Sequence, residues 1–473
     1  MKHTIILFAV GLSLLMSSCS KFLEESTQSE LVPRSAETLN EYLLGDAYPN
    51  TFAINPLDMY MNDDINMIAN ILAARGSHPV YTWQPDMVET GLGASSNQSS
   101  WKSLYAAIQA CNTTLDYLPK VTGTEAFKSY VGGQAQLLRA FYYFNLVNIY
   151  GLPYNDKLSD PKTNLGVPLL LSGGVETTLK TRNTVAEIYS QIEKDLNEGT
   201  ALIDQSKQAH SKYRFGSAAA HLLASRVYLY MEKWDEVIKH TDPLLNGPYQ
   251  LMDLRTWGQV NPLEKPVISA SNPETIWAFG LRGDVIMQDT AAYRMPMELR
   301  NSYSEGDLRH GVYWANGVTK KLHIGDFGLK SAQAFRLSEA YLNRAEALAQ
   351  LYKQGNADAG QKCVNLINSL REKRFQTDKY TPWKLEQISN DILQYIRDER
   401  RRELYSEGGR WFDLRRYGMP RIQHTFFTST AQNENYILEE RDPSYVQPIP
   451  LRVIDLNPKI IQNPLSPIRQ PKN

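Results

Sequence analysis

The sequence predicts a mainly α fold: a scaffold of tetratricopeptide-like helix pairs with a loop-rich insertion, a few short strands and an extended, proline-rich C-terminus. Residues 218–245 and 338–371 share one pattern of small and aromatic residues at helical spacing, which is typical of repeated helix hairpins. Residues 247–330 lie between these copies and are rich in Pro, Gly, Asn and aromatic residues. Five prolines between Pro443 and Pro464 exclude a continuing helix at the C-terminus.

The length and charge of the chain further limit its architecture and its partners. A chain of 473 residues exceeds the usual size of one hydrophobic core, so we expect two or more cores or an extended repeat architecture. A net charge of -1 gives no reason to expect a nucleic-acid partner. We divide the chain into a signal peptide (1–18) and one domain (19–473), which comprises helical repeats (19–246) with a candidate ligand loop (75–100), the insertion (247–330), further repeats (331–418) and an extended segment (419–473).

The N-terminus has the pattern of a lipoprotein signal. A short basic start precedes an apolar run from Ile5 to Met16, and small residues stand directly before Cys19. The run is too short to span a bilayer but suits a secretory signal. We expect cleavage before Cys19 and lipid chains on its thiol, which would anchor the mature chain to a membrane. The alternative is an ordinary signal peptide with an incidental cysteine.

Residues 35–74 predict two helices joined by a segment that contains Asp63 and Asp64. Paired acids suggest a catalytic or calcium-binding role. However, adjacent side chains diverge on a helix or strand, and no further carboxylates are spaced to complete a cage. A structural or capping role is therefore favoured, and a structural calcium ion stays open.

Residues 75–100 predict a loop, because Gly76, Pro79 and later Pro and Gly residues interrupt any regular element. Tyr81 and Trp83 are large rings on this loop, where burial would be difficult. Aromatic rings on a supported loop are candidates for ligand binding. The alternative is that Trp83 fills a hydrophobic gap.

Helical spacing then predicts helices over residues 101–118 and 129–150, and Leu165–Leu171 predicts a short strand. A further helix is expected from about residue 183 to about residue 203. Cys111 and Cys363 both lie in apolar helical patterns. This favours two buried thiols over a disulfide.

The insertion at 247–330 has a weak helix signal, and we expect short strands at Thr275–Phe279 and Gly311–Trp314. An interruption in a helical array is where binding residues usually collect. Tyr293 and Trp314 are the candidates here, whereas Trp277 stands in an apolar run and is expected in the core.

The segment from Arg397 to Gly418 combines many charges with large apolar residues. Opposite charges stand three or four residues apart, so we expect them on neighbouring positions of one helix. Gly408 and Gly409 would end that helix. We interpret the segment as a structural ion-pair cluster that joins the repeats to the C-terminus, carried by Arg400, Glu403, Glu407, Arg410, Trp411, Asp413 and Arg415.

The motif ERRREL-x-x-EG-x-RWFDLRR-x-G within this segment resembles the C-terminal signature of the SusD/RagB family. Members of that family are surface lipoproteins of Bacteroidetes that sit over TonB-dependent transporters. The lipoprotein start, the helix pairs, the SEAYLNRAEA helix at 338–347 and the proline-rich end follow in the same order as in that family. Near the C-terminus, Leu465 and Ser466 follow Asn463-Pro464, and these two residues differ from the sequence that usually follows in that family.

The resemblance implies a lipid-anchored protein of the outer membrane, exposed at the cell surface. Such proteins capture oligosaccharides or polysaccharide fragments and deliver them to a SusC-like TonB-dependent transporter, without catalysis and without a cofactor or metal. Family ligand residues cannot be transferred, because the signature belongs to the scaffold. The choice of Tyr81, Trp83, Tyr293 and Trp314 therefore rests on their expected exposure alone.

Two alternatives remain open: capture of oligopeptides, as in RagB-like members, and an adaptor that holds the transporter without a ligand of its own. The sequence contains no phosphate-binding loop, no dinucleotide-binding motif, no HExxH and no GxSxG. The eight His residues also show no partner spacing for acid-base catalysis, so an enzyme is disfavoured. Two dispersed carboxylates of a glycosidase would leave no such motif.

Overall fold

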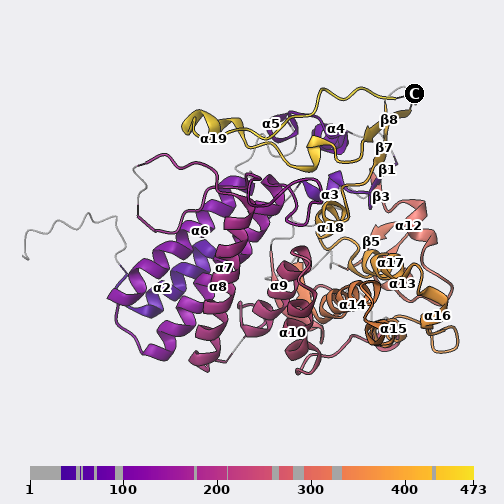
Figure 1. The fold of residues 1–473 in the computed structure, drawn as a ribbon, viewed down its shortest axis with the longest axis horizontal. Helices are drawn as coiled ribbons and strands as arrows, with labels where there is room; N and C mark the ends of the chain where they lie inside the picture. The colour runs from indigo at the N-terminus through magenta and orange to yellow at the C-terminus, as the bar shows by residue number, and fades with distance from the viewer. Residues whose placement is uncertain are drawn as a thin grey trace, which may run out of the picture.

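The structure is a computed structural model of the chain. It describes residues 33–49, 54, 57–68, 72–90, 100–174, 178–209, 211–257, 266–280, 292–321, 333–428 and 433–472. Cys19 and the signal peptide lie outside these residues. The described residues are mainly helical, which confirms the predicted fold class (Figure 1).

In the first half, α6, α7 and α8 lie side by side in Figure 1, and α7 packs against both of the other two. The helices are α2 (Ala36–Tyr42), α3 (Asp58–Met61), α4 (Leu72–Tyr81), α5 (Met87–Thr90), α6 (Ser100–Tyr117), α7 (Glu125–Tyr150), α8 (Val185–Ser206), α9 (Ser217–Tyr230) and α10 (Trp234–Leu245). A capping box of Thr184 and Glu187 starts α8. Gly133 and Gly199 let α7 and α8 approach closely, because a Cβ atom at Gly133 would lie 2.8 Å from the Gly199 carbonyl oxygen.

The second half continues the helical array and adds short strands. Its helices are α11 (Leu254–Trp257), α12 (Met297–Asn301), α13 (Arg309–Val312), α14 (Leu337–Lys353), α15 (Ala357–Glu372), α16 (Leu385–Ile388), α17 (Ile392–Leu404), α18 (Arg410–Arg416) and α19 (Leu451–Leu456). The predicted repeat pairs are α9 with α10 and α14 with α15, and α14 also packs against α10 and α17. The buried apolar residues of these pairs belong to two core clusters: a large one that includes α9 and α10, and a smaller one among α14, α15, α16 and α17.

Eight strands form four antiparallel pairs in the described part of the chain. They are β1 (Asn66–Met67) with β3 (Tyr293–Arg294), β2 (Thr275–Phe279) with β6 (Gln333–Arg336), β4 (Trp314–Ala315) with β5 (Val318–Thr319), and β7 (Ile422–Phe427) with β8 (Asn433–Leu438). In the β7–β8 hairpin Ile422 pairs with Leu438 and Phe427 with Asn433. The pairs β1–β3 and β2–β6 connect the insertion to the repeats on either side.

Several local predictions are confirmed. β2 occupies the predicted strand at Thr275–Phe279, and Trp277 is fully buried in the core. Cys111 and Cys363 are both buried, free thiols. No helix in the described residues is long and apolar enough to cross a membrane.

Three local predictions are wrong. Leu165–Leu171 forms no strand, since only Leu165 makes an isolated bridge to Thr184. Residues 311–314 are the end of α13 and the start of β4. The expected loop at 75–100 contains α4, which runs through Pro79 to Tyr81, and α5, while residues 91–99 lie outside the description. The two rings of this segment are buried, so packing outweighs its low helix propensity.

The α9–α10 pair holds two histidines in direct contact. The Nδ1 atoms of His221 and His240 lie 3.0 Å apart, so one must donate and the other must accept a hydrogen bond. Burial and the neighbouring His221 lower the pKa of His240 to about 4, although Glu236 favours its charged form. Burial also lowers the pKa of His221. The folded protein therefore favours neutral rings at this position.

This pair makes stability depend on pH. Because the folded-state pKa of His240 lies below its ordinary value of 6.5, the unfolded chain takes up protons first as the pH falls. The contribution of neutral His240 to stability should be fully present well above pH 6.5 and should decrease as the pH falls toward 4. When the pH is lowered from 7.5 to 5, protonation of His240 in the unfolded chain should reduce the free energy of unfolding by about 2 kcal/mol. Urea titration at the two pH values measures this difference.

The variant His240→Gln should lose this part of the pH dependence. His310→Gln, which changes an exposed ring on α13, is the control and should keep it. Equal slopes of stability against pH in wild type and His240→Gln would contradict this explanation.

Candidate functional site

Three of the four aromatic residues expected to be exposed come together in the core. Tyr81, Trp83 and Tyr293 are at most 2% exposed. Tyr81 and Trp83 stack on opposite sides of His424 in β7, each with ring centroids 4.2 Å from the histidine. Tyr293 lies 5.6 Å from Tyr81. The expectation that these rings are exposed is wrong.

Their polar atoms also contact the protein itself. The Trp83 Nε1–H donates to the Met61 carbonyl at 2.9 Å, and the Tyr81 hydroxyl accepts from the Met67 backbone amide at 3.0 Å. The Tyr293 hydroxyl lies 2.6 Å from Ser77 Oγ. These rings fix α3, α4, β3 and β7 against one another instead of facing solvent.

The fourth candidate, Trp314, lies elsewhere and is 6% exposed. Its ring packs against His310 at 4.6 Å and Tyr303 at 5.4 Å between centroids. The expectation of exposure is therefore wrong for Trp314 as well. The only reason to expect an exposed Trp314 was its position in the loop-rich insertion.

The signature segment forms α17, a turn and α18, but most of its ion pairs are not within the segment. The Arg402–Glu399 and Arg416–Asp413 pairs follow the expected three-residue spacing. The other charges mostly pair with distant elements, so the expected local pairing is largely replaced by tertiary contacts. We define the ion-pair cluster as Glu403 and Glu399 of α17 with Arg309, Arg336, Arg374, Glu274 and Asp307.

Asp63 and Asp64 also pair with this segment. Arg410 donates to both oxygens of Asp63, at 2.7 and 2.8 Å, and Arg401 donates to Asp64 at 2.7 Å. Burial would raise the pKa of Asp63, but Arg410 and Arg401 hold it at about 2. The two acids thus have a structural role. Among the described residues, no group of three or more His, Cys, Asp or Glu side chains could hold a metal ion.

The α18 end of the segment contacts both the repeats and the C-terminal segment. Arg416 forms a forked pair with Glu346 of α14, and Arg415 donates to the Gly151 carbonyl after α7. The Trp411 ring stacks on Tyr445 at 4.7 Å. Arg400 joins α17 to α18 through Asp413 at 2.8 Å.

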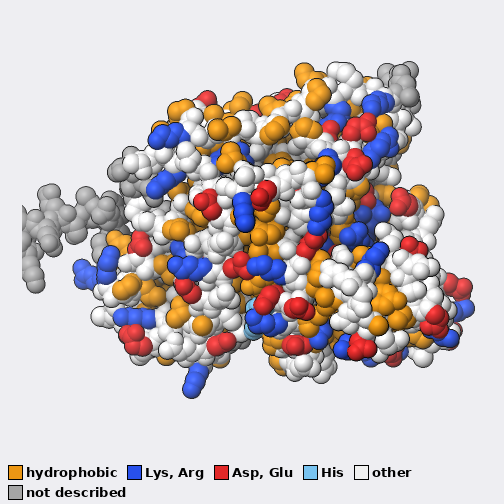
Figure 2. Space-filling model, viewed as in Figure 1, with side chains coloured by type: hydrophobic (Ala, Val, Ile, Leu, Met, Phe, Trp, Pro, Cys, Tyr) orange, Lys and Arg blue, Asp and Glu red, His pale blue; other side chains and the backbone are white. Residues whose placement is uncertain are grey.

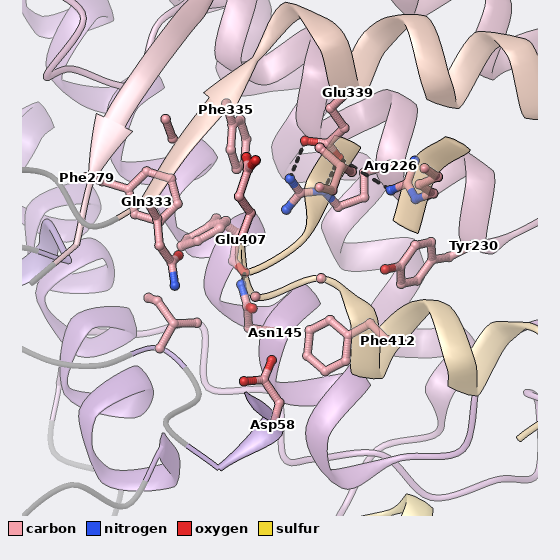
Figure 3. Close-up of a pocket in the computed structure, with 17 residues that line it drawn as sticks. Asp58, Asn145, Arg226, Tyr230, Phe279, Gln333, Phe335, Glu339, Glu407 and Phe412 are labelled. Carbon is pink, nitrogen blue, oxygen red and sulfur yellow. Dashed lines mark hydrogen bonds and ion pairs between the residues drawn. The ribbon is translucent and has the colours of Figure 1, made fainter. Parts of the chain in front are cut away.

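A pocket opens where the repeats, β6 and the turn between α17 and α18 meet (Figure 3). Its space, counted to the open mouth, is about 790 Å³. Its lining includes the rings of Phe141, Tyr230, Phe279, Phe335 and Phe412 and the polar side chains of Asp58, Asn145, Arg226, Gln333, Glu339, Arg400 and Glu407.

Several charged groups of the pocket form ion pairs, either with one another or with charged side chains outside the pocket. Arg226 of α9 forms a forked ion pair with Glu339 of α14, with both distances 2.7 Å, and its guanidinium lies 4.5 Å from the Phe335 ring centroid. Burial alone would raise the pKa of Glu407, but Arg336 and Lys321 hold it below its usual value. The carboxylates of Glu339 and Glu407 are therefore both engaged in ion pairs.

Two amide side chains also line the pocket. Figure 3 shows Gln333 of β6 reaching into the pocket, and its side chain is only partly buried. Asn145 of α7 donates to the Phe141 carbonyl at 2.8 Å and lies near Asp58 and Phe412. Rings beside planar polar groups can pack against an apolar ligand face and hydrogen-bond to hydroxyl groups.

Sequence reasoning missed this pocket. Its residues come from α3, α7, α9, β2, β6, α14 and the signature segment, and no local spacing connects them. The signature segment was singled out in advance but assigned to the scaffold, and it contributes Arg400, Leu404, Glu407, Gly408, Gly409 and Phe412 to the lining. Only the folded arrangement brings the amides and rings together.

The fold and the buried signature define the class of protein: a tetratricopeptide-type helical scaffold with an insertion. Comparisons with known proteins then give the family. A family described as starch-binding and associating with the outer membrane matches residues 21–229, and the SusD family matches residues 310–465. The chain belongs to the SusD/RagB family.

Similar proteins cover most of the chain. The SusD-like protein P2 of Formosa agariphila is 22% identical over 376 residues, which are 67% of this chain and 70% of that protein. A solved structure from Bacteroides vulgatus is 25% identical with a TM-score of 0.73, covering 92% of this chain and 99% of its own. A SusD-like carbohydrate binding protein, also from Bacteroides vulgatus, is 19% identical with a TM-score of 0.69, covering 90% and 98%.

Proposed function

We propose that this protein captures oligosaccharides or polysaccharide fragments at the cell surface and delivers them to a SusC-like TonB-dependent transporter. Membership of the SusD/RagB family carries the proposal, and one relative by fold is described as a carbohydrate binding protein. Lipid chains on Cys19 would hold the protein at the outer membrane. The mechanism is binding without catalysis.

The pocket between β6, α9 and α18 is the proposed place for one sugar unit. Largely buried rings line its wall, from Phe335 at 1% to Phe412 at 7% exposed, while the amides of Gln333 and Asn145 would exchange hydrogen bonds with hydroxyl groups. The forked Arg226–Glu339 pair presents further polar atoms without a separate structural change. Fixed polar groups reduce the entropy lost when a ligand binds.

Affinity electrophoresis through gels that contain individual polysaccharides tests the proposal. At least one polysaccharide should slow the wild-type protein. Gln333→Ala should then weaken that retention by about fivefold to tenfold, because one hydrogen bond to the ligand contributes about 1 kcal/mol. Thermal stability should stay unchanged, since the Gln333 side chain is only partly buried.

Gln361→Ala is the matched control, because Gln361 is exposed on α15 and lines no part of the pocket. It should keep wild-type retention. Peptides found by mass spectrometry in the natively purified protein, together with no retention by any glycan, would favour oligopeptide capture instead. A successful transporter pull-down with no ligand of either class would favour the adaptor.

A further inference from the structure

Exposed apolar side chains gather on α19 and the C-terminal segment that follows it. Leu456, Ile461 and Ile468 are 63%, 66% and 72% exposed. Figure 2 shows hydrophobic side chains gathered on the edge of the molecule that α19 and this segment occupy in Figure 1. We define the C-terminal apolar surface as Leu179, Leu451, Leu456, Ile461, Leu465 and Ile468.

Leu179 comes from another part of the chain but belongs to the same surface. The Asn457 side chain donates to the Lys180 carbonyl at 2.8 Å, which places the residue after Leu179 beside the end of α19. Monomeric soluble proteins rarely display large apolar side chains so close together unless the surface binds something.

The segment is held firmly, so its apolar side chains are displayed by a fixed backbone. The Leu451 amide donates to Glu89 at 2.8 Å, and Asn463 donates to the Tyr150 carbonyl at 3.0 Å. Ile460 is 4% exposed while Ile461 is 66% exposed. Neighbouring residues therefore divide between the core and the outer surface.

Cations accompany the apolar groups. Arg452 and Lys459 are exposed within the segment, and Lys180 is exposed beside it, against two exposed acids, Asp455 and the Glu89 that accepts from the Leu451 amide. Apolar side chains interspersed with Lys and Arg are typical of surfaces that lie in the interface of a membrane with anionic lipids. A protein partner would not by itself require this excess of positive charge.

We propose that the C-terminal apolar surface lies against the lipid surface and sets the orientation of the protein on the membrane. The proposal rests on the lipid anchoring at Cys19 that belongs to the proposed function. A lipid anchor keeps the chain near the membrane but leaves its orientation open. With the chain held there, a few weak apolar contacts suffice to orient it, because the effective concentration is high.

The full-length, lipidated protein in vesicles of phosphatidylethanolamine and phosphatidylglycerol provides the test. Leu456→Cys and Ile468→Cys variants would carry an environment-sensitive thiol dye. Cys111 and Cys363 are fully buried, so labelling is selective. Tyr395→Cys, at a position 37% exposed on α17, is the control. Circular dichroism checks that each labelled variant is folded.

The dye at positions 456 and 468 should shift its emission to shorter wavelength and be quenched by nitroxide-labelled lipid, whereas the dye at position 395 should not. Vesicle flotation is measured first, and protein that fails to float contradicts the anchoring. Protein that floats without a shift at 456 and 468 overturns the proposed orientation. A shift that occurs only after a transporter is added to the vesicles also overturns it, because the surface would then be a protein interface.

Discussion

Replacement of Glu403 by alanine should destabilise the protein by about 3–5 kcal/mol, because it leaves several buried arginines without their shared partner. Glu403 is fully buried. Arg374 donates to both of its carboxylate oxygens at 2.9 Å, and Arg336 approaches one of them at 3.3 Å. The Tyr313 hydroxyl donates to the same carboxylate at 2.8 Å.

The charges explain the size of the effect. Burial alone would raise the pKa of Glu403, but Arg374 and Arg336 hold it well below its usual range. The folded state therefore depends on an ionised carboxylate at this position. Glu403→Gln keeps the shape and loses the charge, so its cost should be smaller than that of Glu403→Ala but still measurable.

Equilibrium unfolding in guanidinium chloride, followed by circular dichroism, measures both variants. Glu125→Gln is the control, since the Glu125 side chain is 91% exposed and pairs loosely with Lys128 at 3.7 Å. It should change stability by less than about 0.5 kcal/mol. If Glu403→Ala unfolded at the wild-type midpoint, the ion-pair cluster would have no structural role.

The cluster also shows what local sequence can predict about a charged segment. Arg, Glu and Asp at helical spacing predicted neighbouring pairs, and Arg402–Glu399 is one. The main partners of Glu403 come from the insertion and the ends of other elements, about 29 to 94 residues away along the chain. Spacing within one helix carries no information about such partners.

The repeats were predictable for the opposite reason. Small residues and aromatic residues at 3.6-residue spacing directly determine which helix face packs, so α9–α10 and α14–α15 could be predicted from local pattern. The same holds for β2, whose apolar run is short and β-rich. An element can therefore be predicted from its own sequence when the periodicity of that sequence already shows which of its faces is buried.

The candidate site could not be predicted, because burial is a tertiary property. Tyr81 and Trp83 stand in a stretch with Gly and Pro, yet His424 and Thr425, more than 340 residues away, contact Tyr81. The pocket is likewise assembled from distant segments, among which Gln333 and Asn145 have no distinguishing local pattern. Low helix propensity therefore did not indicate exposure.

Replacement of Trp83 by alanine should destabilise the protein by about 3–5 kcal/mol, the usual cost of removing a fully buried tryptophan ring. The ring is 0% exposed and stacks on His424. Trp83 also has a positive φ angle of 50°, which ordinary residues rarely adopt, so the surrounding packing must hold it there. Loss of the ring removes that packing.

Trp83→Phe separates the contributions of the indole. Phenylalanine keeps an aromatic surface beside His424 but cannot donate to the Met61 carbonyl, which accepts from Trp83 Nε1 at 2.9 Å. This variant should lose about 1–3 kcal/mol, less than Trp83→Ala. Tyr213→Ala, which removes a ring that is 50% exposed, is the control and should have a much smaller effect.

Measuring glycan binding by the Trp83 variants shows whether the Trp83 ring belongs to the core or contacts the ligand. Folded Trp83→Phe should retain the wild-type affinity for any glycan that slows the protein in affinity electrophoresis, because the ring is fully buried between His424 and the Met61 carbonyl. Unfolding in urea and glycan retention are measured on the same preparation. A variant with wild-type stability and selectively lost retention would show instead that Trp83 reaches the ligand, which requires a rearrangement of α4 and β7.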